Sequence, residues 1–142
     1  MSKRQQTNNR TPKPQTTLLF PFVTRRGGFD TSIVVTNASA EPFGTKPRSG
    51  TCSIHYFGGT ESGGPAPPTR TAHVIGPGQQ LLFSFFGGGS GLNATPDFGG
   101  YVVIECFFPD AHGYAMIGDL GLQRVAAGYE AKLLPQRRRT RA

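Results

Sequence analysis

Apolar and polar residues alternate along much of the chain with the two-residue period of a β-strand. Within residues 50–57 the alternation places Cys52, Ile54 and Tyr56 on one face and their neighbours on the other. Residues 29–37 are rich in β-branched side chains, which fit a pleated, half-buried surface. Both segments are therefore predicted strands.

Similar runs between turns rich in Gly and Pro predict the remaining strands. Pro21 lies inside the first run, which predicts either an edge strand or a strand with a bulge. Residues 120–134 have some helical spacing, but Gly121 and Gly128 favour a strand there. The predicted runs are 15–23, 70–75, 79–86, 101–108, 112–120 and 124–134. Together they predict an all-β fold, an antiparallel β-sandwich of about eight strands that is Ig-like or jelly-roll-like.

Composition supports this fold class and excludes others. A chain of 142 residues has the size of one domain. Its 20 Gly and 12 Pro argue against a helical bundle, because both residues break helix interiors. No apolar run reaches the length of a transmembrane helix. The first ten residues are polar and basic, so we expect no Sec-type export signal.

The positive charge is concentrated at the two ends of the chain. The body, 15–134, holds seven bases against eight acids and is nearly neutral. Four bases lie in a tail at 1–14 and four in a tail at 135–142, with no acid in either. We expect these tails to contact nucleic acid or another anionic surface, or to act only as solubilising ends. The basic residues are Lys3, Arg4, Arg10, Lys13, Arg137, Arg138, Arg139 and Arg141.

The two cysteines fall on apolar faces of predicted strands. Cys52 shares its face with Ile54, and Cys106 shares its face with Ile104. A disulfide between them would close a loop of about 55 residues and stabilise the fold by about 4 kcal/mol in the chain-entropy model. The alternative is a pair of buried free thiols. We favour the disulfide.

No motif in the sequence predicts catalysis, a metal site or a cofactor. The three histidines, His55, His73 and His112, lack the spacing of metal ligands, and Asp110 with His112 is more typical of a polar turn. The Gly-rich run at 87–91 contains Ser90 but has neither nucleophile-elbow nor P-loop spacing. We expect a loop there and a protein that is not an enzyme.

Aromatic residues are frequent and some are expected at the surface. Successive residues of a strand point to opposite faces, so one ring of the pair at 85–86 and one of the pair at 107–108 lie on the outer face. Such rings either rest under a loop or contact another chain. The run 15–23 is a candidate assembly strand, which would pair with another chain through an extended backbone. Its apolar members are Leu18, Leu19, Phe20 and Phe22.

Several short motifs occur in order along residues 18–134, and the last is Ala-His-Gly-Tyr-Ala at 111–115. Together they resemble a β-sandwich domain of secreted and surface proteins of environmental bacteria. The resemblance implies a Cys52–Cys106 pair, a structural or adhesive role, an extracellular or cell-surface location and no catalytic residues. The basic tails depart from that pattern. The other motifs are Leu-Leu-Phe-Pro-Phe-Val at 18–23, Gly-Phe-Asp-Thr at 28–31, Asn-Ala-Ser at 37–39, Pro-Phe-Gly-Thr at 42–45, Gly-Thr-Cys at 50–52, and Gly-Tyr at 100–101.

Two functions follow from these observations. The first is a structural or interaction module that assembles with itself or with a protein partner through strand edges and aromatic faces. The second is a coat or packaging protein whose basic tails bind nucleic acid without sequence specificity. The tails contain no aromatic residue on which a base could stack, and basic tails are often only solubilising ends, so we favour the first function.

Overall fold

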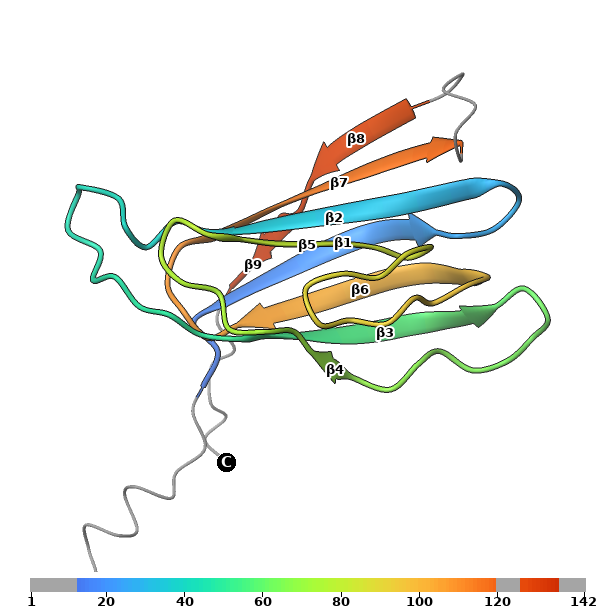
Figure 1. Cartoon of the computed structure of the whole chain (residues 1–142), viewed down its shortest axis with the longest axis horizontal. Coiled ribbons are helices and arrows are strands. Elements are labelled where there is room, and N and C mark those ends of the chain that lie inside the picture. The colour runs from blue at the N-terminus through green and yellow to red at the C-terminus, as the bar shows by residue number, and fades with distance from the viewer. Residues whose placement is uncertain (1–12, 120–125, 136–142) are drawn as a thin grey trace, which may run out of the picture.

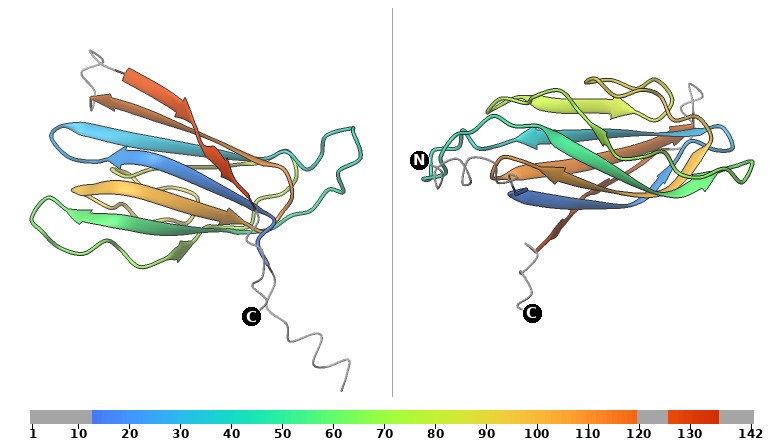
Figure 2. Two further views of the ribbon diagram at one scale, coloured as in Figure 1. Left: turned by 180° about the vertical axis from the view of Figure 1, so that it is seen from behind. Right: turned by 90° about the horizontal axis from the view of Figure 1, so that it is seen from below.

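The chain folds into two antiparallel β-sheets that pack face to face. The structure is a computed structural model, and it describes residues 13–119 and 126–135. One sheet has five strands in the order β4-β3-β6-β1-β9, and the other has four in the order β5-β2-β7-β8. Figure 1 shows the strands of both sheets in one view, and the right panel of Figure 2 shows the two layers from below. We call them the five-stranded and the four-stranded sheet.

The nine strands are distributed along nearly the whole described chain. The sandwich predicted from the alternation pattern is confirmed, with one strand more than expected because the last predicted run divides in two. The strands are β1 (Thr16–Thr24), β2 (Phe29–Asn37), β3 (Cys52–Thr60), β4 (Arg70–Thr71), β5 (Gln80–Ser84), β6 (Phe98–Cys106), β7 (Ala111–Asp119), β8 (Ala126–Glu130) and β9 (Lys132–Leu134).

The final segment passes from one sheet to the other. β8 pairs with β7 in the four-stranded sheet, whereas β9 pairs with β1 in the five-stranded sheet. Between them, the N–H of Ala131 donates to the carbonyl of Gly113. The segment therefore closes one side of the sandwich, and in Figure 1 β8 and β9 follow each other across that side. A single strand over residues 124–134 was the wrong prediction here.

β1 lies inside the five-stranded sheet, so the edge-strand interpretation of Pro21 is wrong and the bulge interpretation is right. β6 pairs along one side of β1 and β9 along part of the other. The register with β6 shifts between Phe20 and Val23, which leaves Pro21 and Phe22 out of the regular pairing. A bulge accommodates the proline, which has no N–H to donate.

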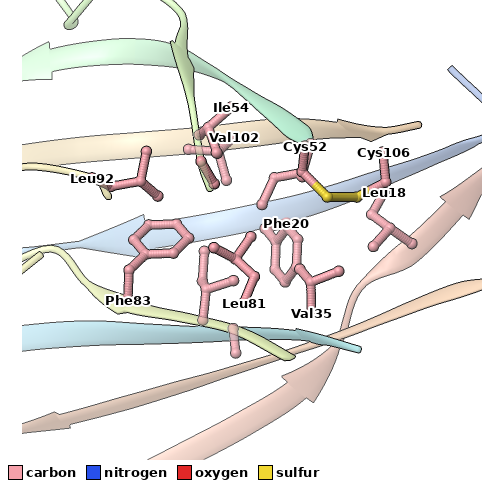
Figure 3. Packing of buried hydrophobic residues seen from close by; sticks show 14 of the residues in the cluster. Leu18, Phe20, Val35, Cys52, Ile54, Leu81, Phe83, Leu92, Val102 and Cys106 are labelled. Atoms are coloured by element: carbon pink, nitrogen blue, oxygen red, sulfur yellow. A yellow bond between two sulfur atoms is a disulfide. The ribbon is translucent and has the colours of Figure 1, made fainter. Parts of the chain in front are cut away.

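The core contains the disulfide between Cys52 and Cys106. The two residues face each other directly on β3 and β6, with their Cα atoms 4.1 Å apart. The N–H of Phe107 donates to the carbonyl of Thr51, which makes the cysteines a non-hydrogen-bonded pair, the closer of the two antiparallel pair types. Figure 3 shows the bond beside Leu18, over the interior that both sheets share.

An aromatic cluster fills the other part of the interior. Phe85 and Phe98 stack with ring centroids 5.7 Å apart, and the ring of Tyr56 meets Phe98 edge-on at 5.6 Å. Phe85 is buried while Phe86 is 55% exposed, as expected for that pair, and Phe108 is buried beside a half-buried Phe107. The described part of the chain contains no helix able to cross a membrane.

Candidate interaction surfaces

The strand β8 forms an edge of the four-stranded sheet. Hydrogen-bonded and non-hydrogen-bonded pairs alternate along an antiparallel ladder, so the bond from Ala131 to Gly113 identifies which residues of β8 bond to β7. These residues are Ala127 and Tyr129. The backbone N–H and C=O groups of the alternate residues point away from β7. Those residues are Ala126, Gly128 and Glu130, all exposed. No described strand lies beyond them.

The opposite edge of this sheet, β5, is covered by its own loop. The hydroxyl of Ser90 accepts a hydrogen bond from the N–H of Leu82 and donates one to its carbonyl, both at 3.0 Å. Ser84 and Gly88 exchange two backbone hydrogen bonds next to this contact. The Gly-rich run around Ser90 is therefore a structural cap, in agreement with the expected loop.

The edges of the five-stranded sheet are also protected. Beside β3, β4 pairs only over Ser53 and Ile54, and the following part of the edge faces a segment with prolines at 65, 67 and 68. Prolines protect an edge because they cannot donate to a ladder. The outer edge, β9, is three residues long and carries Lys132, and short edges with lysine resist pairing.

An exposed apolar patch lies on the outer face next to β8. Tyr114 and Met116 on β7 are 41% and 49% exposed and pair with Glu130 and Gly128. A Cβ atom at Gly128 would lie 2.3 Å from the hydroxyl oxygen of Tyr114. The phenol therefore leans across β8 above a position that has no side chain, and reaches the open edge.

A second aromatic surface lies on the outer face of the five-stranded sheet. The rings of Phe57 and Tyr101 stack with centroids 4.9 Å apart, and both are more than 40% exposed. Beyond them Gly58 and Gly100 face each other at positive φ, where a Cβ on either would meet backbone at 2.2 Å or less. Phe22, at the bulge of β1, is 56% exposed.

The candidate assembly strand has its apolar residues divided between the core and the surface. Leu18 and Phe20 are buried in the sandwich, Leu19 is half-buried and Phe22 is exposed. Pairing of β1 with both β6 and β9 occupies the backbone over Leu18 and Leu19. The structure thus moves the candidate edge from β1 to β8, which sequence reasoning missed because it did not separate β8 from β9.

A cavity of about 500 Å³ lies where β7 begins and β8 passes into β9. Its lining includes Glu130 and the pair Asp110 and His112, whose carboxylate and Nε2 are 2.8 Å apart. The one buried hydroxyl that lines it, Thr16, donates to the carbonyl of Phe108 and accepts from the N–H of Ala111. That hydroxyl is therefore committed to hydrogen bonds of the fold.

Ser90, His112 and the carboxylate of Asp119 lie far apart in the fold and form no catalytic triad. Ser90 is bound to β5, whereas His112 and Asp119 lie at opposite ends of β7, paired with Thr36 and Phe29. His55 bonds Glu105 and Thr69 on an outer face. Among the described residues, no three His, Cys, Asp or Glu side chains gather as a metal site would need.

Two arginines that follow β1, Arg25 and Arg26, make contacts within the sandwich. The guanidinium of Arg25 lies 4.9 Å from the ring centroid of Phe86, whose N–H donates to Asp30. Burial raises the pKa of Asp30, and its hydrogen bonds and Arg25 oppose that rise in part. Arg26 donates to the carbonyls of Gly59 and Asp97. These two arginines stabilise loops of the sandwich.

The basic tails lie almost wholly outside the described residues. Lys13 is the one member of the predicted anion contacts within them, and it is exposed.

Comparison of the chain with protein-family models, with curated proteins and with solved structures finds no match. The similarity to secreted and surface domains therefore stays a prediction from the motifs.

Proposed function

We propose that this chain is a non-catalytic interaction module, a β-sandwich subunit that binds its partner through the open edge of β8. The observation that carries the proposal is the contrast between edges. Among the described strands, the β5, β4 and β9 edges have a hydroxyl cap, prolines, or short length with a lysine, whereas β8 has none of these. Natural sheets block edges that must not pair.

The edge offers what β-strand addition requires. Ala126, Gly128 and Glu130 present backbone donors and acceptors along one line. Ala126 has only a methyl group and Gly128 has no side chain, so neither obstructs an approaching strand. In this mode the main chain supplies affinity and neighbouring side chains supply specificity. The exposed Tyr114 and Met116 lie next to the edge and would meet the side chains of the added strand.

The proposal is tested with an extended, capped peptide of alternating Thr and Val residues, followed by amide NMR of the full chain. We expect shifts and slowed hydrogen exchange at Ala126, Gly128 and Glu130, and no response to a peptide N-methylated at alternate residues. Ala126→Pro should abolish the response, because it removes an N–H that points away from β7. Equal binding of both peptides would contradict the proposal.

A second function rests on the charge distribution. Eight of the 15 Lys and Arg residues lie in the two tails, which contain no acid. Basic arms on a neutral sandwich would neutralise phosphates without reading sequence, as in a coat or packaging protein. The two functions are compatible, because assembly would use β8 and nucleic-acid binding would use the tails.

A further inference from the structure

We infer that the partner of the β8 edge is a second copy of the same chain, related by a two-fold axis that passes beside Gly128. This inference rests on the proposed function and names its partner. Antiparallel pairing of β8 with its copy would join two four-stranded sheets into one of eight strands.

The backbone pattern of the edge is complementary to itself. With Gly128 opposite Gly128 of the second copy, Ala126 faces Glu130 on both sides of the axis. All three are residues whose polar groups point outward, so the pairing forms about six backbone hydrogen bonds. A two-fold contact must be self-complementary in this way, because each residue that contacts its counterpart is contacted by it in turn.

Charge also favours this register. The only charged residue of β8 is Glu130. The two copies of Glu130 would lie at opposite ends of the paired segment, separated by about 14 Å along the strands. That exceeds the Debye length of about 8 Å at physiological ionic strength. The register therefore avoids like-charge repulsion, which direct pairing of Glu130 with itself would introduce.

The outer face supplies apolar contact at the axis. Gly128 has no side chain, and the phenol of Tyr114 occupies the space above it. Facing residues of a hydrogen-bonded pair have Cα atoms about 5.5 Å apart, so the two Tyr114 rings would approach each other over the paired glycines. Met116 lies opposite Gly128 on β7 and borders the same contact. Dimer formation would thus cover two exposed side chains in each copy.

The glycine at residue 128 leaves room for the Tyr114 ring in this position. The backbone there is not in the left-handed region, so another residue would fit its φ angle. A Cβ atom would instead collide with the Tyr114 hydroxyl and displace the ring. An interface of one strand is small, so we expect a dissociation constant on the order of 10–100 μM.

The first measurement is sedimentation equilibrium of the full chain from about 5 to 500 μM, a range that brackets the expected constant. We expect a reversible monomer–dimer equilibrium, and Ala126→Pro should weaken it at least tenfold. The matched control is Gln80→Pro, which places the same ring at an outward position of the covered β5 edge. It should leave the equilibrium unchanged. Circular dichroism checks that both variants remain folded.

The second measurement tests the register by mild oxidation. In the double variant Ala126→Cys, Glu130→Cys, each new cysteine would face the other type across the axis and form covalent dimers. Either single variant would hold its two copies about 14 Å apart, too far for a disulfide. The native pair is bonded and fully buried, so it does not interfere. Equal cross-linking by single and double variants would overturn the register.

The outcomes separate this inference from the proposed function. A protein that stays monomeric at 500 μM but still adds the peptide at β8, in an Ala126→Pro-sensitive manner, retains the proposed function and overturns the dimer. A dimer that Ala126→Pro does not weaken overturns both. Cross-linking of the double variant alone, together with a proline-sensitive equilibrium, supports both.

Discussion

The phenol hydroxyl of Tyr129 forms hydrogen bonds with both backbone polar groups of Phe22, a residue of the opposite sheet. It accepts a hydrogen bond from the N–H at 3.3 Å and donates one to the carbonyl at 2.5 Å. Phe22 lies at the bulge of β1, beyond the three residues that β9 covers. The tyrosine hydroxyl therefore takes the place of a neighbouring strand where the ladder is interrupted.

The same arrangement occurs three more times among the described residues. The hydroxyl of Ser39 accepts from the N–H of Arg48 and donates to its carbonyl. The buried hydroxyl of Thr31 accepts from the N–H of Thr24 and donates to its carbonyl, both at 2.9 Å. Ser90 does so for Leu82 at the β5 edge. A hydroxyl suits this position because it is both a donor and an acceptor. At Phe22 and at Leu82 such a hydroxyl occupies backbone groups that an added strand would otherwise need.

Removal of the Tyr129 hydroxyl should destabilise the fold without disturbing its ring. Tyr129→Phe leaves the N–H and C=O of Phe22 without their protein partner, and we expect the free energy of unfolding to fall by about 1 kcal/mol. Urea unfolding followed by circular dichroism measures the change. Tyr114→Phe is the control, since that ring is exposed, and it should leave stability unchanged. Equal stability of wild type and Tyr129→Phe would contradict the role of the contact.

The same residue should shape the alkaline limit of stability. Burial raises the pKa of Tyr129 above its usual value of 10.0, although the N–H of Phe22 opposes the rise in part, and burial likewise raises the pKa of Tyr56. The unfolded chain therefore loses these protons first. The contribution of these two phenols to the free energy of unfolding is fully present below pH 10. It is lost as the pH rises through their folded-state pKa values.

Comparison of variants over that pH range isolates the Tyr129 contribution. Urea midpoints from pH 8 to 11.5 should decline less steeply for Tyr129→Phe than for wild type, because one of the two perturbed phenols is absent. The remaining decline reports Tyr56. Parallel curves for the two proteins would show that Tyr129 titrates alike in both states.

Removal of the Thr31 hydroxyl tests the same kind of contact at a buried position. Thr31→Val keeps the shape of the side chain but removes a hydroxyl that is fully buried, leaving the N–H and C=O of Thr24 unsatisfied. We expect a loss of about 1–3 kcal/mol. Thr31→Ser retains the hydroxyl and should lose less. A larger loss for serine than for valine would show that packing of the methyl group, and not the hydrogen bonds, dominates at this site.

Loss of the disulfide should have the largest effect of these changes. The bond joins residues 54 apart in sequence. The double variant Cys52→Ala, Cys106→Ala is expected to lose about 4 kcal/mol, chiefly through the entropy of the unfolded chain. Urea unfolding of the variant and of oxidised wild type measures the difference, and wild type unfolded in the presence of a reductant provides the control. A loss below about 1 kcal/mol would contradict the chain-entropy account.

The local features of the fold were predictable, because strand alternation is a property of consecutive residues. The bounds of β2 and the faces of Cys52, Ile54 and Tyr56 follow from that pattern. The change of sheet at Ala131 does not follow from that pattern, because it depends on a hydrogen bond to Gly113 that exists only in the folded chain. The contact between Tyr129 and Phe22 spans 107 residues, and no local signal marks a tyrosine for it. The sequence consequently offered residues 15–23 as the candidate assembly strand and did not identify β8 as an edge.

The last prediction separates assembly from nucleic-acid binding. Because the excess positive charge lies in 1–14 and 135–142, any affinity for nucleic acid should reside there. The eight bases of the tails would release counterions on binding, so affinity should fall steeply with salt and depend little on base sequence. Deletion of both tails should abolish binding, while the fold remains, since every described strand and the disulfide lie within 15–134. The measurement is a salt titration of full-length and trimmed protein against a random-sequence duplex and single strand.

Undetectable binding of the full-length protein at about 50 mM salt would remove the coat-protein function, because non-specific binding is strongest at low salt. Binding that survives the deletion would instead place the nucleic-acid contact on the sandwich. Self-association through β8 should be the same in both proteins, because the deletion leaves Ala126, Gly128 and Glu130 intact.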